Sequence, residues 1–177
     1  MLRDATPADH AELRLIFRRA SLSNEGDRAP LLADPQHLVW REPAAAAGRV
    51  RVRVAVGAGG VIGGFASLVL AGDVAELEDL FVDPDHMRRG IGRALVADAR
   101  RLAAGAGCST LAVTANPHAA AFYAAAGFAG TAAQATALGV GTRLTLDLRR
   151  RGGAAAPTIA HRHRTSRRCC RPPATRR

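Results

Sequence analysis

One short run of the sequence combines glycines, arginines and carboxylates in a spacing suited to binding a phosphate. Arg88-Arg-Gly-Ile-Gly-Arg93 follows an apolar stretch that ends in an Asp83-Pro84 turn, and an amphipathic pattern begins at Ile91. A strand, a glycine turn and a helix start, in this order, present free backbone N–H groups at the positive end of a helix dipole, which favours an anion. Glu76 and Glu78 stand just upstream, so candidate bases accompany the candidate anion site.

Two common phosphate-binding motifs do not fit this loop. A dinucleotide fold would have Gly-x-Gly-x-x-Gly/Ala and an acid at the tip of the following strand, whereas this chain has Leu95 and Val113-Thr-Ala-Asn116. A P-loop needs Gly-Lys-Ser/Thr, and all 25 basic residues of this chain are arginine. The absence of lysine also excludes Schiff-base chemistry. A diphosphate held by main-chain amides and flanking arginines remains.

The loop resembles the pyrophosphate loop of the GNAT acetyltransferase superfamily, Gln/Arg-x-x-Gly-x-Gly/Ala. Asn116-Pro-His-Ala-Ala-Ala-Phe-Tyr-Ala-Ala-Ala-Gly-Phe128 resembles the family's second motif, Asn-x-x-Ala-x-x-x-Tyr-x-x-x-Gly-Phe, in the family's order and spacing. Met87 stands where the family most often has Gln or Arg, a small change for a loop that binds through its backbone. The resemblance covers residues 1–148. It implies an α/β fold with a GNAT-like mixed, mostly antiparallel central sheet flanked by helices, with acetyl-CoA as co-substrate and no metal.

Acetyl transfer from a thioester to an amine has two chemical requirements. An amine with a pKa of ~10 is mostly protonated at neutral pH, so a carboxylate must take a proton from it, directly or through a water. The departing thiolate needs an acid, for which a tyrosine hydroxyl with a pKa of ~10 is well matched. By the resemblance, Tyr123, the only tyrosine, stands where the family's tyrosine reaches the thioester sulfur. The alternative is a tyrosine that only packs its helix onto the sheet.

Two glutamates are candidates for the base. Histone-type members carry their glutamate at the position of Glu76, and polyamine-type members at that of Glu78, beside an acid that matches Asp79. We favour Glu78. Alternation along the strand predicts one face with Glu76, Glu78, Leu80 and Val82, and another with Leu77, Asp79 and Phe81. The strand bulge found in the family would interrupt this pattern.

The resemblance also implies the residues that contact the cofactor and the acceptor. Val82 would pair through its backbone with the pantetheine arm like an added strand, and Asn116 would contact the cofactor near the pyrophosphate or the pantetheine. Glu25 and Asp27 lie in a segment where the family admits its acceptor, so with Asp79 they would select a cationic substrate; a merely solvated loop is the alternative. The expected cofactor-binding residues are Val82, Arg88, Arg89, Gly90, Ile91, Gly92, Arg93, Asn116 and Tyr123.

Hydrophobic periodicity places these residues on alternating strands and helices. A capping pattern at Thr6-Pro-Ala-Asp9 predicts the start of the first helix, and residues 21–35 are predicted to be a polar loop. Hydrophobic patterns and turn residues predict the other strands and helices. The predicted strands are 2–5, 50–56, 61–70, 74–82, 109–114, 128–134 and 141–148, and the later helices are 35–42, 91–105 and 117–126.

The charge divides the chain into two parts. Residues 149–177 contain ten arginines and no acid, whereas the other 148 residues hold 15 arginines and all 15 acids. We therefore expect a formally neutral domain over 1–148 and a disordered Arg-rich tail over 149–177. Nucleic acid is expected as a partner only through this tail; a dispensable extension is the favoured alternative.

Composition limits the remaining function classes. The chain has no run of about 18 apolar residues, so no membrane span is expected. The N-terminus does not resemble a signal peptide, and three cysteines at 108, 169 and 170 have neither a disulfide nor a metal-binding pattern, so a reduced, cytoplasmic protein is expected. The favoured function is an acetyl-CoA-dependent N-acetyltransferase for a small primary amine. A protein or peptide acetyltransferase and a non-catalytic acyl-CoA or nucleic-acid binding module are the alternatives, and a homodimer is left open.

Overall fold

The computed structural model describes residues 1–43, 49–136 and 139–149. Within these residues a seven-stranded sheet has the order β1-β2-β3-β4-β5-β7-β6. Neighbouring strands are antiparallel except β4 and β5, which are parallel. The predicted α/β fold with a mixed, mostly antiparallel sheet is confirmed. The strands are β1 (Leu2–Asp4), β2 (Arg49–Val56), β3 (Ile62–Ala71), β4 (Val74–Val82), β5 (Thr110–Ala115), β6 (Ala129–Thr136) and β7 (Gly139–Asp147).

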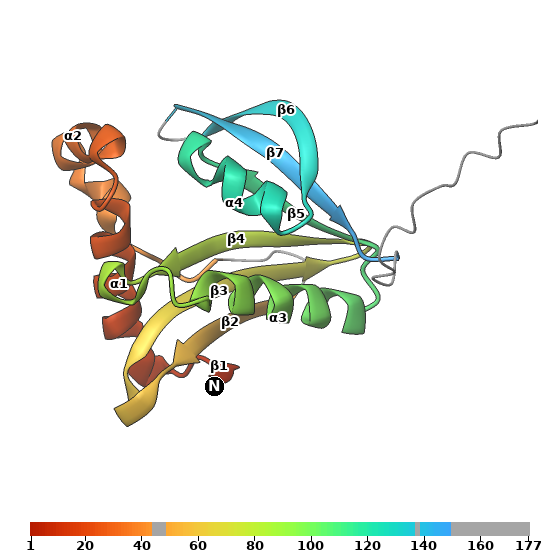
Figure 1. Cartoon of the computed structure of the whole chain (residues 1–177), viewed down its shortest axis with the longest axis horizontal. Helices are drawn as coiled ribbons and strands as arrows, with labels where there is room; N and C mark the ends of the chain where they lie inside the picture. Colours follow the sequence, from red (N-terminus) through yellow and green to blue (C-terminus); the bar gives the residue numbers. More distant parts are fainter. Residues whose placement is uncertain (44–48, 137–138, 150–177) are drawn as a thin grey trace, which may run out of the picture.

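Helices cover both faces of the sheet (Figure 1). One face packs against α3 and α4 through a core that includes Leu77, Leu95, Leu111 and Tyr123. The other packs against α1 through Leu13, Ile16, Trp40, Val54 and Phe65. Each such side chain contributes roughly 1.5–3 kcal/mol by burial, so two apolar layers hold the sheet between the helices. The helices are α1 (His10–Ser21), α2 (Glu25–Ala33), α3 (Ile91–Gly105) and α4 (Ala120–Ala125), with 3₁₀ turns η1 (Pro7–Asp9), η2 (Pro35–Leu38), η3 (Ala58–Gly60), η4 (Pro84–His86) and η5 (Pro117–Ala119).

The predicted capping pattern at the first helix is present. Asp9 accepts hydrogen bonds from the backbone N–H of Thr6 at 2.7 Å and from its hydroxyl at 2.8 Å. Arg3 donates to both carboxylate oxygens of Asp9, at 2.7 and 2.9 Å. The Arg3 hydrogen bonds hold the pKa of Asp9 well below its ordinary value, with further lowering by Thr6. A 3₁₀ turn, η1, therefore leads into α1 from a charged cap.

The prediction of a polar loop over 21–35 is wrong, because α2 lies within it. Asn24 caps this helix, its Oδ1 accepting from the N–H of Gly26 at 3.0 Å. Pro30 stands inside the helix. Because an interior proline usually costs about 3 kcal/mol, the sequence did not indicate a helix here. Burial of Leu31 helps to offset this cost. The predicted helix over 35–42 is only the short turn η2.

A bulge interrupts β4 in the middle of the site region. Ser67 of β3 pairs with Asp79, and the next residue, Leu68, pairs with Leu77, so Glu78 is the extra residue in the described register. The predicted alternation is therefore wrong. Leu77 and Leu80 share the core on the α3 side, whereas Phe81 packs in the core on the α1 side. The extra residue reverses the faces of everything after it.

The strands β4 and β5 pair over only a short length. Their register runs from Val74↔Thr110 to Glu76↔Ala112. β4 then continues to Val82 and β5 to Ala115, and the two strands diverge (Figure 1). The β5-side edge of the second half of β4 is therefore left without a strand partner in the described residues, and it faces the opening between the two halves of the sheet.

The predicted tail lies, apart from Arg149, outside the described residues. Arg149 donates to Asp73 at 3.3 Å. Among the described helices, none has the length and apolar character needed to cross a membrane.

Candidate active site

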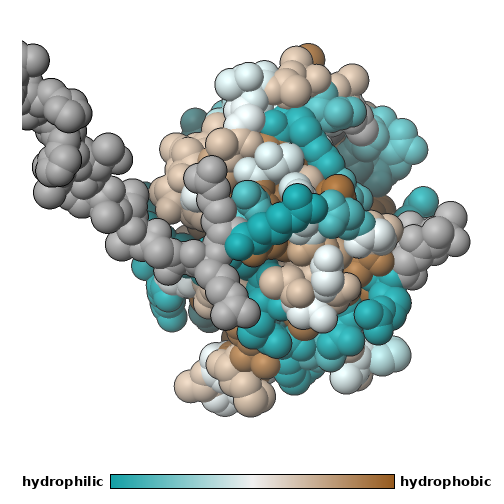
Figure 2. All heavy atoms as spheres, turned by 90° about the vertical axis from the view of Figure 1, so that its right-hand side faces the viewer, coloured by the Kyte–Doolittle hydropathy of each residue, from teal (hydrophilic) through white to brown (hydrophobic). Residues whose placement is uncertain are grey.

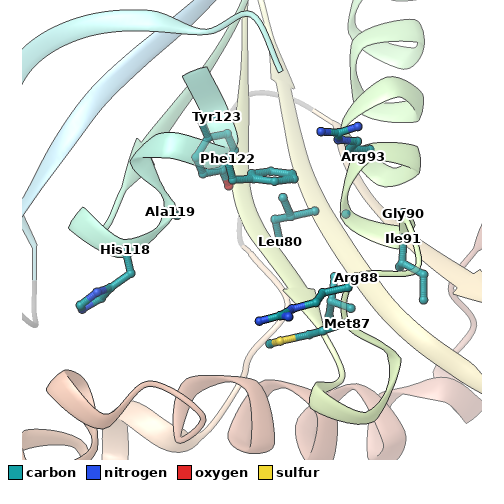
Figure 3. Close-up of a pocket in the computed structure, with 12 residues that line it drawn as sticks. Leu80, Met87, Arg88, Gly90, Ile91, Arg93, His118, Ala119, Phe122 and Tyr123 are labelled. Carbon is teal, nitrogen blue, oxygen red and sulfur yellow. The ribbon is translucent and has the colours of Figure 1, made fainter. Parts of the chain in front are cut away.

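A cavity of about 770 Å³ lies where the second half of β4 meets the glycine loop, the start of α3, and α4. Figure 3 shows side chains from these elements surrounding it, with Leu80 between Tyr123 above and Met87 below. The structure thus brings together most of the cofactor-binding residues predicted from the two sequence motifs. The lining residues are Leu80, Val82, Met87, Arg88, Gly90, Ile91, Gly92, Arg93, His118, Ala119, Phe122 and Tyr123.

The glycine loop has the backbone shape of an anion cradle. Gly90 caps α3 with φ of +79°, a left-handed conformation that favours glycine. The N–H groups of Ile91, Gly92 and Arg93 belong to the first turn of α3 and have no intrahelical acceptor. A Cβ atom on Gly92 would come within 3.3 Å of Phe122 Cζ, so α4 packs closely against the start of α3 here. With two arginines, Arg88 and Arg93, in the lining, these residues fit the diphosphate of coenzyme A.

Two residues predicted to bind the cofactor lie elsewhere. Arg89 is exposed and borders a smaller neighbouring cavity together with Gly90 and Ile91. Asn116 is the N-cap of η5, where its Oδ1 accepts from the N–H of Ala119 at 2.9 Å. Neither is among the described residues that line the main cavity. Asn116 therefore helps to set the start of the segment that carries Tyr123, and direct contact of Arg89 or Asn116 with the cofactor stays a prediction.

Tyr123 is held in a fixed position at the cavity wall. It is 5% exposed, and its ring makes edge contacts with Phe122 and Phe128 at centroid distances of 5.2 and 5.3 Å. Burial raises the pKa of its hydroxyl well above the ordinary value, and the negative charge of Asp79 adds to this rise. The raised pKa keeps the phenol protonated and also makes it a weaker acid than an ordinary tyrosine.

The two candidate bases have different surroundings. Glu76 forms an ion pair with Arg143 of β7. Glu78 stands at the bulge, with an exposed side chain. Partial desolvation raises the pKa of Glu78, repulsion from Glu76 and Asp79 raises it further, and Arg143 opposes the rise. A carboxylate with a raised pKa is a stronger base, so these surroundings favour Glu78.

Asp79 is a third carboxylate, and it lies deeper than Glu78. Its Oδ2 accepts a hydrogen bond from Trp40 Nε1 at 2.9 Å. Burial raises the pKa of Asp79, while the hydrogen bond from Trp40 opposes the rise. Trp40 belongs to the core on the α1 side, so Asp79 faces that layer.

The residues expected to select the acceptor lie on a helix at the edge of the cavity. Asp27, in the first turn of α2, has Oδ1 at 3.8 Å from Nε2 of His118. A Cβ on Gly26 would lie 3.5 Å from the same imidazole, which shows how closely α2 approaches η5. Since His118 lines the cavity, Asp27 is brought near it, and Glu25 is the first residue of the same helix.

Sequence reasoning missed several residues of this site. His118 lines the cavity, but it stands at an unspecified position of the second motif, Asn-x-x-Ala, which therefore did not indicate it. Phe122 precedes Tyr123 in that motif and lies in the lining. Arg143 carried no signal, because its contact with Glu76 depends on β7 pairing beside β5.

Comparison with known proteins agrees with this geometry. The model of the Acetyltransferase (GNAT) family matches residues 16–128, more than half of the chain. A GCN5-related N-acetyltransferase from Rhodopseudomonas palustris is similar in structure, with a TM-score of 0.65 and 26% identity over 83% of this chain and 94% of that one. A search of curated proteins found no match.

Two structures solved with a bound cofactor share the fold. The PaiA N-acetyltransferase from Thermoplasma acidophilum, in complex with coenzyme A, has a TM-score of 0.62 and 15% identity over 83% of this chain and 98% of that one. The yncA protein from Salmonella typhimurium, with its cofactor acetyl-CoA, has a TM-score of 0.58 and 22% identity over 90% and 98%. With the family match and the cavity at its glycine loop, the chain belongs to the GNAT acetyltransferase family and is an N-acetyltransferase that uses acetyl-CoA.

Proposed function

We propose that the chain transfers the acetyl group of acetyl-CoA to a primary amine of a small molecule, with Glu78 as the base and Tyr123 as the acid. The observation that carries this proposal is the β4 bulge at Glu78, two residues before Leu80, which lines the cavity together with Tyr123. Bound acetyl-CoA supplies an acetyl thioester that is reactive toward an amine nitrogen.

The cofactor is held by the glycine loop and the free edge of β4. The first-turn N–H groups of α3 receive the diphosphate, and Arg88 and Arg93 add charge. Val82 pairs with β3 at Gly64, and its β5-side edge lies beyond the last β4–β5 pair. An extended ligand arm therefore adds to this edge as a strand would. Arg89 and Asn116 contribute at the margin of the same site.

Glu78 takes a proton from the ammonium group of the acceptor, directly or through a water. Its raised pKa makes this transfer easier than for an ordinary glutamate. Glu76 is the alternative base, but Arg143 already pairs with its carboxylate. Tyr123 gives its phenolic proton to the leaving group, and its rigid ring contacts keep the hydroxyl in place.

A small cationic acceptor fits the residues around this site. Glu25, Asp27, Glu78 and Asp79 supply carboxylates from α2 and β4, whereas Arg143 pairs with Glu76, and Asp27 in the first turn of α2 lies close to His118 of η5. Their negative charge attracts an ammonium group. The acidic strand β4 and the formally neutral domain favour a small amine over a protein acceptor.

The direct test is thiol release from acetyl-CoA over a panel of monoamines, diamines, polyamines and short peptides with free N-termini. We expect turnover of at least one small amine. Diamines should be preferred over monoamines that carry no second positive charge. Asp27→Asn should raise KM for the preferred amine and leave KM for acetyl-CoA unchanged. Binding of acetyl-CoA with no turnover of any amine, or turnover of peptides alone, would overturn the proposal.

We further propose that residues 1–148 form the catalytic domain and that the protein acts in the cytoplasm. The family match ends at residue 128, inside this range, and β7 completes the sheet at Asp147. A chain that ends at Arg151 should keep the acetyl-CoA affinity of the full protein. A large loss of affinity would contradict this domain boundary.

A further inference from the structure

Asp79 has a more specific task than attracting the acceptor. It follows the bulged residue Glu78 directly, and it is the residue whose pairing with Ser67 resumes the β3–β4 register. A contact that holds Asp79 in this register therefore also holds the bulge at Glu78.

A single buried side chain provides that fixed point. Trp40 is 3% exposed and packs edge-on against Phe65 at 5.2 Å and His10 at 5.7 Å. Its Nε1–H donates to Asp79 Oδ2 at 2.9 Å. Because the indole is held on two sides by aromatic rings, the hydrogen bond ties Asp79 to a rigid part of the core.

The opposite strand leaves Asp79 little freedom. Its register partner, Ser67, is fully buried, and the Ser67 hydroxyl lies near the carboxylate without forming a hydrogen bond within the described residues. Regular pairing from Leu68↔Leu77 onward would instead place Glu78 opposite Ser67 and turn Asp79 toward the apolar core on the α3 side. The hydrogen bond to Trp40 therefore favours the bulged register over the regular one.

We propose that Asp79 is a positioning residue, which uses its hydrogen bond to Trp40 to hold the β4 bulge and thereby directs the Glu78 carboxylate toward the acceptor. This inference rests on the proposed function, in which Glu78 is the base. Trp40 and Asp79 do not touch the reacting atoms in this account. They act by setting the direction in which the Glu78 side chain points.

The test compares kcat and KM for Asp79→Ala, Trp40→Phe and Asp79→Asn, each alone and with Glu78→Gln. Asp79→Ala and Trp40→Phe should lower kcat by about 10²-fold, the loss that a misplacement of about 1 Å produces, with little change in KM for acetyl-CoA. Asp79→Asn should keep most of the activity, because its amide oxygen still accepts from Trp40. In the Glu78→Gln background, Asp79→Ala should cause no further loss, since the residue through which it acts is already disabled.

Controls separate this effect from loss of folding. Asp98→Asn removes another buried carboxylate, one held by Arg53 at 2.6 Å on the α3 side, and it should lower stability while leaving kcat unchanged. If Asp79→Ala does not fold, Trp40→Phe removes the hydrogen-bond donor and keeps an aromatic ring, and a melting curve measures the stability lost with the smaller ring. As the only tryptophan, Trp40 also reports its own hydrogen bond by fluorescence, and its emission should shift in Asp79→Ala and much less in Asp79→Asn.

The outcomes distinguish two failures. If Glu78→Gln keeps wild-type kcat, the proposed function fails, and the inference fails with it. If Glu78→Gln is inactive but Asp79→Ala and Trp40→Phe are fully active, only the inference is overturned. Equal further loss from Asp79→Ala in the Glu78→Gln background would likewise overturn it, because the effect would then not pass through Glu78.

Discussion

Arg143 of β7 pairs with Glu76 of β4 across the intervening strand β5. The pair lies at the last residue of β4 that is registered with β5, where the two strands begin to diverge. Glu78, two residues further along β4, stands at the bulge, and the charge of Arg143 lowers its proton affinity. Much of the chemistry proposed for the site depends on this arrangement of three charges.

Removing the arginine should therefore change the pH profile. Arg143→Gln takes away the charge that opposes the raised pKa of Glu78, so that pKa should rise further. The base must be deprotonated, and the acid limb of kcat/KM should consequently move to higher pH. Rate measurements from pH 5 to 9 check this expectation. An unmoved limb in a folded variant would show that Arg143 does not act on the base.

Replacing the tyrosine should separate chemistry from packing. Tyr123→Phe removes the hydroxyl and keeps the ring contacts with Phe122 and Phe128. We expect kcat to fall by about 10²–10⁴-fold, the usual contribution of a general acid or base, with thermal stability close to wild type. Steady-state kinetics and a melting curve are sufficient. Wild-type turnover by Tyr123→Phe would show that Tyr123 packs its helix onto the sheet and does not act as the acid.

A methyl group in the glycine loop should weaken cofactor binding. Gly90→Ala puts a side chain at a φ of +79°, which costs a non-glycine residue about 1–2 kcal/mol; the loop should relieve this strain by changing shape and must restore it to bind, so acetyl-CoA affinity should fall roughly tenfold. Gly105→Ala is the matched control on the same helix, because its Cβ would meet open space. Calorimetric titration with acetyl-CoA compares them. Equal affinities in both variants would argue against binding at this loop.

The charged cap of α1 should make stability depend on pH in the acid range. The pKa of Asp9 is lowered in the folded protein, so its contribution is present above the pKa of the unfolded chain, near ~3.9, and is lost as pH falls through the folded value. Asp9→Asn should cost about 1–2 kcal/mol of unfolding free energy at pH 7. The difference from wild type should shrink below pH 3. A constant difference at all pH values would rule out the charge as its source.

The sequence predicted the elements that carry strong local patterns. The alternating Val50–Val56 stretch, the helix after the glycine loop and the motif around Tyr123 were found in the predicted places, because periodicity and turn residues act locally. The helix α2 was not predicted, because an interior proline such as Pro30 argues against a helix more strongly than a cap such as Asn24 argues for one. The resemblance implied a bulge in this strand, but its place at Glu78 and the pairing of Arg143 depend on which strands become neighbours, so no pattern along the chain shows them.

The sequence also does not show which residues pair with the arginines of β2. Figure 2 shows hydrophilic and apolar residues mixed on the face toward which α3 runs. In β2, Arg49, Arg51 and Arg53 alternate with valines and share the face toward α3, where Arg53 pairs with Asp98 and Arg51 with Asp4. The period of two puts these arginines on one face, and only the fold shows their partners.

The pH dependence of kcat/KM for Glu78→Gln, beside wild type and Glu76→Gln, tests the proposed mechanism most directly. We predict an acid limb in wild type and Glu76→Gln, and for Glu78→Gln a loss of about 10²-fold or more at neutral pH with the limb moved up toward the pKa of the amine, about 10, at unchanged acetyl-CoA affinity. Full activity of Glu78→Gln, or transfer of the loss and of the moved limb to Glu76→Gln, would contradict the assignment of Glu78 as the base.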